Sequence, residues 1–79
     1  MIIHDKERHR FQLDEAYTEY EIRGSKLIIL HTFVPESMAG RGIAGLLVQE
    51  AFSWASSHEL HPAAVCTYAA AWMKRHNVK

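Results

Sequence analysis

A short run of glycines is the part of this sequence whose residue types are best suited to chemistry. Gly40, Arg41 and Gly42 follow a long apolar run and come directly before a segment with helical spacing. Glycine lets the backbone take unusual angles, and the free N–H groups at a helix start attract anions. Arg41 could add a side-chain cation. The loop therefore indicates either an anion site or a tight strand-to-helix turn in which Gly45 packs against the sheet.

Two stricter motifs are absent from the sequence. The loop does not match Gly-x-x-x-x-Gly-Lys-Ser/Thr, the pattern of nucleotide triphosphate P-loops. The stretch His58-Glu59-Leu60-His61 is not the His-Glu-x-x-His pattern of zinc hydrolases, and Pro62 follows it at once. We therefore expect no metal site.

Two further residues are candidates because of the segments in which they lie. Cys66 is the single cysteine, between a short apolar run and the last helical segment. A helix start favours the thiolate, whereas a buried cysteine commonly behaves as a small hydrophobe. His31 lies in the longest apolar run, where it is either a structural histidine or a base whose ring faces a cleft.

A sheet must position these residues, and the spacing of apolar residues predicts one. Residues 8–13 alternate weakly and residues 16–23 clearly, and Gly24-Ser25 indicates a hairpin to the run 26–34. That run is almost continuously apolar, which is typical of a central strand buried on both faces, and a proline ends it. Residues 4–10 are mostly charged or histidine, and they favour a solvated edge strand or a frayed end.

Helical spacing begins directly after the glycine loop. Residues 43–58 carry an apolar stripe, residues 62–66 form a run of strand length, and Thr67 is suited to cap a helix over 68–76. Strands joined across a helix are parallel. We therefore predict a mixed α/β fold in one domain, residues 1–79. Its order is an antiparallel three-strand meander, the glycine loop, a helix, a parallel strand and a C-terminal helix.

Composition excludes several classes of function. Nine Lys and Arg balance nine Asp and Glu, so the formal net charge of zero argues against a nucleic-acid binder that relies on broad electrostatic attraction. No apolar run approaches the roughly 20 residues needed to cross a bilayer, and the first residues are not a signal peptide. A single cysteine excludes an internal disulfide framework. We expect a cytoplasmic protein without membrane or nucleic-acid partners.

Two segments together resemble a known family. The stretch His31-Thr32-Phe33-Val34-Pro35-Glu36, with Gly40-Arg41-Gly42-Ile43-Ala44 and Leu46-Leu47 after it, resembles the acetyl-CoA-binding motif of GNAT-type N-acetyltransferases. In that pattern, Gln/Arg-x-x-Gly-x-Gly/Ala, Gly42 and Ala44 match, whereas Ala39 stands in place of Gln or Arg. The later stretch Cys66-Thr67-Tyr68 to Lys74-Arg75-His76 resembles the very small members of the superfamily. The resemblance covers residues 27 to 76.

The resemblance implies a minimal GNAT-like sandwich that binds acetyl-CoA. The CoA pyrophosphate would lie on six backbone amides, those of Ala39, Gly40, Arg41, Gly42, Ile43 and Ala44. The pantetheine arm would run beside Phe33 and Val34. Tyr68 would protonate the departing CoA thiolate, and Cys66 would either take the acetyl group or line the pocket.

The implied function is a small N-acetyltransferase acting on an unidentified amine, by direct transfer or through Cys66. The alternative is a non-catalytic acyl-CoA-binding or protein-interaction module that keeps the cofactor loop, which the missing Gln or Arg at Ala39 favours. An anion-binding regulatory domain is a third possibility. The sequence stops at Lys79 without the final strands of larger members. We therefore expect an acceptor side that is open, or completed by another chain in a homodimer.

Overall fold

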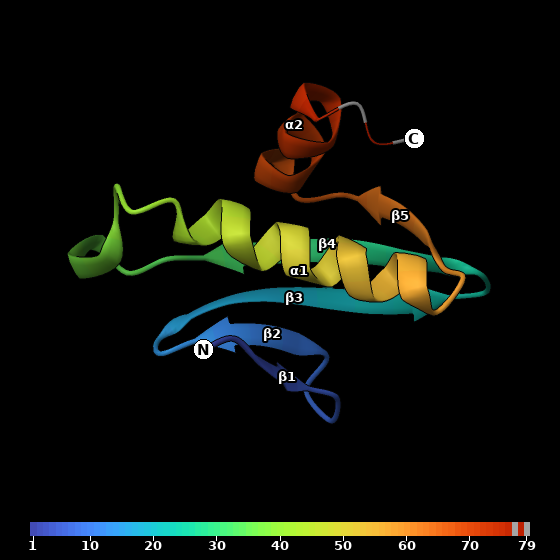
Figure 1. Cartoon of the computed structure of the whole chain (residues 1–79), viewed down its shortest axis with the longest axis horizontal. Helices are drawn as coiled ribbons and strands as arrows, with labels where there is room; N and C mark the ends of the chain where they lie inside the picture. The colour runs from blue at the N-terminus through green and yellow to red at the C-terminus, as the bar shows by residue number, and fades with distance from the viewer. Residues whose placement is uncertain (77, 79) are drawn as a thin grey trace.

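A five-stranded mixed sheet organises the residues that the structure, a computed structural model, describes, which are 1–76 and 78 (Figure 1). The strands lie side by side in chain order. They are β1 (Ile3–Asp5), β2 (Arg10–Leu13), β3 (Ala16–Arg23), β4 (Lys26–Phe33) and β5 (His61–Ala64). The first four are antiparallel, and β5 is parallel to β4. The predicted mixed α/β class is confirmed, with one antiparallel strand, β1, added to the three-strand meander.

The helical elements are a short 3-10 helix η1 (Glu36–Met38) and two α-helices, α1 (Ile43–Ser57) and α2 (Thr67–Arg75). The helix predicted over 43–58 is confirmed, and His58 is its C-cap. Six residues of α1 are buried on one stripe: Ile43, Leu47, Val48, Ala51, Phe52 and Ala55. That spacing recurs every three to four residues, as an amphipathic helix requires.

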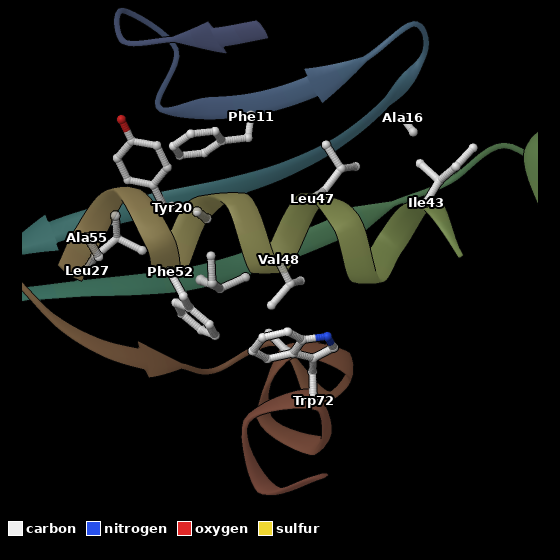
Figure 2. Packing of buried hydrophobic residues seen from close by; sticks show 13 residues of the cluster. Phe11, Ala16, Tyr20, Leu27, Ile43, Leu47, Val48, Phe52, Ala55 and Trp72 are labelled. Atoms are coloured by element: carbon white, nitrogen blue, oxygen red, sulfur yellow. The ribbon is translucent and has the colours of Figure 1, made fainter. Parts of the chain in front are cut away.

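The core lies between α1 and one face of the sheet (Figure 2). From the sheet, Phe11, Tyr20 and Leu27 point into it. From α2, Trp72 turns toward α1, with its ring centroid 5.8 Å from that of Phe52. Both helices therefore share one hydrophobic cluster on one side of the sheet.

The prediction that residues 26–34 are buried on both faces is wrong. In β4 only Leu27 and Ile29 are buried, whereas Leu30, His31 and Phe33 are exposed. The reason is that α1 and α2 pack on the face that holds Leu27 and Ile29. No helix in the described part of the chain covers the other face, which we call the uncovered face. A continuous apolar run does not by itself reveal how many layers flank it.

Two boundaries near the C-terminal helix also differ from the prediction. The last strand spans His61–Ala64 rather than residues 62–66, because the chain bends away from β4 after Ala64. Thr67 is not the N-cap of α2: Cys66 holds that place with extended backbone angles, and its side chain makes no capping hydrogen bond. Lys74 and Arg75 lie in the last turn of α2, where cations suit the helix dipole.

Candidate functional site

The glycine loop presents unpaired backbone N–H groups at the start of α1. Gly40 and Gly42 have φ values of 79° and 72°, in the left-handed region that favours glycine, and Gly42 is the N-cap of α1. In the described part of the chain, the N–H groups of residues 40–45 donate no backbone hydrogen bond, and no side chain caps the helix. Such donors at a helix start form an anion site. The N–H of Ala39 is different, because it already donates to the Glu36 carbonyl at 3.1 Å.

The three glycines in this part of the chain, Gly40, Gly42 and Gly45, have different structural roles. Residues 40–45 read Gly-x-Gly-x-x-Gly, a spacing in which the first two glycines shape a phosphate-binding turn and the third allows close packing. Gly40 and Gly42 make the turn here. A Cβ added to Gly45 would lie 3.3 Å from Tyr68 Oη and 3.7 Å from Trp72 Nε1. Gly45 therefore packs against α2, and the expectation that it packs against the sheet is wrong.

A bulge in β4 precedes this loop. The pairing with β3 joins Tyr20 to Ile29 and Glu19 to His31, so Leu30 is an extra residue in β4. A bulge bends the strand and shifts the faces of the residues that follow it. Thr32 therefore lies on the helix side of the sheet, opposite the buried Thr18, and His31 lies on the uncovered face.

Beyond the bulge, β4 and β5 separate. Their register ends at Ile29 and Ala64, and the N–H groups of Val65 and Cys66 both donate to the Ile29 carbonyl, at 3.0 and 3.2 Å. Figure 1 shows β5 leading away from β4 toward α2. The edge of residues 30–33 that faces β5 has no strand partner among the described residues. An extended ligand can pair with such an edge as an added strand.

Cys66 lies at this separation. Its thiol is half-buried and free, and its Sγ lies 3.7 Å from the hydroxyl of Thr32. Thr32 Oγ1 lies 2.9 Å from Thr18 Oγ1 on β3. The cysteine side chain therefore contacts the stretch of β4 beyond the last residue that pairs with β5.

The predicted acid and base lie in different surroundings. Tyr68 is partly exposed on α2, and its hydroxyl faces Gly45 of α1. His31 is exposed on the uncovered face, with its ring centroid 5.9 Å from that of Tyr17 and Glu19 opposite it in register. The structure thus brings Cys66 and Tyr68 to the helix side and leaves His31 on the other side of the sheet.

The remaining predicted cofactor residues surround the loop. Phe33 is exposed, with its ring 5.6 Å from that of Tyr17, whereas Val34 is half-buried against the core. Arg41 is exposed at the loop, Ile43 is buried at the start of α1, and Ala44 is half-buried. Their backbones follow one another from the bulge in β4 to the first turn of α1.

Comparison with known proteins decides the family. The sequence profile of the GCN5-related N-acetyl-transferase family matches residues 8–79. The chain belongs to this family. Among its relatives are proteins named Protein NATD1. That of Xenopus tropicalis is 33% identical over 78 residues, which cover 90% of this chain and 72% of the relative. That of Danio rerio is 35% identical over 90% of this chain and 71% of the relative, and that of Homo sapiens is 32% identical over 90% of this chain and 69% of the relative.

One hollow of this GNAT-type chain lies away from all the predicted site residues. It has a volume of about 800 Å³ and lies between the second half of α1, the start of β5 and Trp72. Polar side chains of Gln49, Ser53 and Ser56 and the carboxylate of Glu59 line it beside Phe52. The unpaired N–H groups lie at the opposite end of α1, so this hollow is separate from them.

Thr18 and Thr32 are the residues of the candidate site that the sequence analysis missed. A signal was present for Thr18, because it falls in the same phase of the alternation as Ala16 and Tyr20, which are buried. A threonine in a buried phase needs a hydrogen-bond partner. No comparable signal marks Thr32, because the bulge at Leu30 that turns it toward the helices has no sequence pattern of its own. No group of three or more His, Cys, Asp and Glu suited to a metal occurs among residues 1–76 and 78.

Proposed function

We propose that this chain is a small acetyl-CoA-dependent N-acetyltransferase that moves an acetyl group to an amine. One observation carries the proposal: the unpaired N–H groups of residues 40–45 follow, after η1, on a strand whose edge is free beyond Ile29. Backbone donors at a helix start suit a pyrophosphate, and a free strand edge suits the amide-bearing pantetheine arm. Family membership supports the same donor.

The residues present fit the CoA pyrophosphate. The N–H groups of residues 40–44 would hold it, with Arg41 as an added cation, and Ala39 contributes no free N–H. The pantetheine arm would follow β4 past Phe33 and Val34. Acetyl-CoA supplies a thioester whose carbonyl carbon accepts the amine nitrogen.

The side chains that would donate and accept protons lie on opposite sides of the sheet. Tyr68 has a hydroxyl that can donate a proton to a departing thiolate on the helix side. His31, on the uncovered face, can take the proton that the amine loses. Cys66 either lines the site or takes the acetyl group first. We place the acceptor at the free edge of β4 beyond Ile29, where the amine can approach the thioester from the uncovered face that holds His31.

One observation favours a non-catalytic acyl-CoA-binding module instead. Ala39 carries no polar side chain where the family pattern has Gln or Arg, and its N–H is already paired. Such a module would bind CoA and show no turnover with any amine. A set of primary amines assayed for acetyl transfer therefore separates the two functions.

Titration calorimetry with acetyl-CoA, CoA and dephospho-CoA tests binding, and Gly42→Val tests the site. Valine at φ 72° is strained and puts its side chain beside the N–H groups. We expect it to lower acetyl-CoA affinity at least tenfold, about 1.4 kcal/mol.

Gly24→Val is the matched control, because Gly24 has φ 61° in the β3–β4 turn and equally open space. It should cost a similar strain, about 1–2 kcal/mol of folding stability, and leave affinity unchanged. A folded Gly42→Val chain that binds acetyl-CoA like the unmodified protein would remove the site from this loop.

A further inference from the structure

A chain of hydrogen bonds links the Cys66 thiol to the backbone of β4 through two threonines. Cys66 Sγ lies 3.7 Å from Thr32 Oγ1, and Thr32 Oγ1 lies 2.9 Å from Thr18 Oγ1. Thr18 Oγ1 lies 3.4 Å from the carbonyl oxygen of His31. The four groups come from β3, β4 and the residue before α2, so the chain crosses the point where β4 and β5 separate.

The chemistry of the groups fixes the direction of this chain. A carbonyl only accepts, so Thr18 donates to His31, and each hydroxyl has a single proton. Thr32 therefore donates to Thr18, and its lone pair accepts the thiol proton of Cys66. Thr18 is fully buried, and it is the one buried polar side chain among residues 1–76 and 78. Because Thr18 is buried, water cannot replace a hydrogen bond that its hydroxyl loses.

We propose that Thr32 is a positioning residue for Cys66, and that both threonine hydroxyls turn around when the thiol loses its proton. In the thiolate form Thr32 donates to the sulfur, Thr18 donates to Thr32, and the His31 carbonyl gives up its hydroxyl partner. No proton passes along the chain, because the thiol proton leaves to solvent and the hydroxyls only rotate. The proposal rests on the proposed function only in placing Cys66 at the acetyl-transfer site.

Removing either hydroxyl should shift the thiol–thiolate balance, in opposite directions. Thr32→Val removes the donor that the thiolate needs, so less thiolate forms at a given pH. Thr18→Val removes the acceptor that holds the Thr32 proton in the thiol form, which frees that proton for the sulfur. A loss of packing alone gives no reason for opposite signs.

The experiment measures the rate at which iodoacetamide alkylates Cys66 as a function of pH in the full chain. Cys66 is the only cysteine, so every alkylated molecule reports on it. We expect Thr32→Val to move the profile to higher pH and to slow alkylation at pH 7 by about threefold or more. Thr18→Val should move the profile to lower pH, and Thr32→Ser, which keeps the hydroxyl, should restore it.

Coincident profiles, or shifts of Thr32→Val and Thr18→Val in the same direction, would overturn the proposal. If the Thr18→Val chain does not fold because Thr18 is buried, the variants at the half-buried Thr32 still decide. Equal alkylation rates in Thr32→Val and Thr32→Ser would overturn the proposal. Slower alkylation in Thr32→Val that returns to the original rate in Thr32→Ser would support the proposal. Calorimetry with CoA on the same proteins separates the two claims. Opposite shifts of the two alkylation profiles without CoA binding would uphold the threonine chain and refute the proposed function. CoA binding with coincident alkylation profiles would support the proposed function and refute the threonine chain.

Discussion

Cys66 and Tyr68 are two residues apart in the sequence and contact different elements. The thiol of Cys66 contacts Thr32 on β4, whereas the hydroxyl of Tyr68 faces Gly45 in the first turn of α1. The thiol therefore lies at the free strand edge, and the phenol lies over the helix start that carries the unpaired N–H groups. This separation would suit a thioester held between them, with the proposed acid Tyr68 and the possible nucleophile Cys66 on different sides of the thioester.

Substitution of these two residues decides the route of acetyl transfer. We expect direct transfer, in which Cys66→Ala retains activity and Tyr68→Phe loses it by a factor of about 10²–10⁴, because the departing thiolate lacks its proton donor. Initial rates with a fixed amine measure both variants, and acetyl-CoA affinity, expected to be unchanged in Tyr68→Phe, is the control.

The two-step route makes the contrary prediction. Mass spectrometry after mixing with acetyl-CoA alone would then show an acetyl adduct on Cys66, and Cys66→Ala would be inactive. On either route, acetyl-CoA should protect Cys66 from iodoacetamide. Without any protection, the thiol lies away from the bound thioester.

The first strand is tied to the rest of the fold by an aromatic cluster around His4. Its ring stacks on Phe11 with centroids 3.9 Å apart, and its edge meets Trp54 of α1 at 4.7 Å. His4 Nε2 lies 2.5 Å from Tyr20 Oη on β3. Burial lowers the pKa of His4 from 6.5, and nearby Lys6 and His58 lower it further. A strand of three residues is thus held by one half-buried histidine.

Stability should fall in mild acid because of His4. Its pKa is lower in the folded chain than in the unfolded one, so the folded state binds fewer protons. The contribution of His4 to the free energy of unfolding is therefore complete above pH 6.5 and is lost as the pH falls below that value. Burial raises the pKa of Tyr20 above 10.0, so its contribution is lost only as the pH rises beyond 10.0. Urea unfolding between pH 7 and pH 5 measures this loss of stability in acid.

His4→Leu isolates this effect. It should lower stability at pH 7 by about 1 kcal/mol, because Tyr20 loses a hydrogen-bond partner, and it should flatten the decline toward pH 5. The exposed His61 on β5 provides the control, because His61→Leu should leave the decline in place. An equally steep decline in His4→Leu would show that other groups cause the acid sensitivity.

Local patterns in the sequence predicted the elements well and their junctions less well. The period of two in residues 16–23 and the apolar stripe of residues 43–58 both correspond to observed elements, because each depends on burial of one face. The bulge at Leu30 and the packing of His4 depend on partners far away in the sequence. The turn at Gly40 and Gly42 could be predicted, because positive φ is the property that distinguishes glycine. The Thr18–Thr32 contact needs the register of β3 and β4, which no single segment encodes.

The layers of the molecule leave the proposed acceptor side open. Helices pack on one face of the sheet, and the other face exposes Phe33 and His31. The outer strands are poor templates for strand addition: β1 has three residues, and Pro62 in β5 lacks an N–H to offer. A homodimer stays a prediction, and it would have to rely on surfaces other than paired strand edges.

Bound acetyl-CoA should stabilise the whole chain strongly. A domain of this length buries only roughly 60–65% of its unfolded surface, so ligand binding adds a large share of the total stability. At a ligand concentration of 100 times Kd the gain is about 2.7 kcal/mol. For a domain of 60–100 residues that gain raises Tm by about 10 °C or more. Differential scanning calorimetry with and without acetyl-CoA measures the shift, which Gly24→Val should keep and Gly42→Val should largely lose. A Tm that does not respond at that ratio would mean that the free N–H groups of the loop bind something other than CoA.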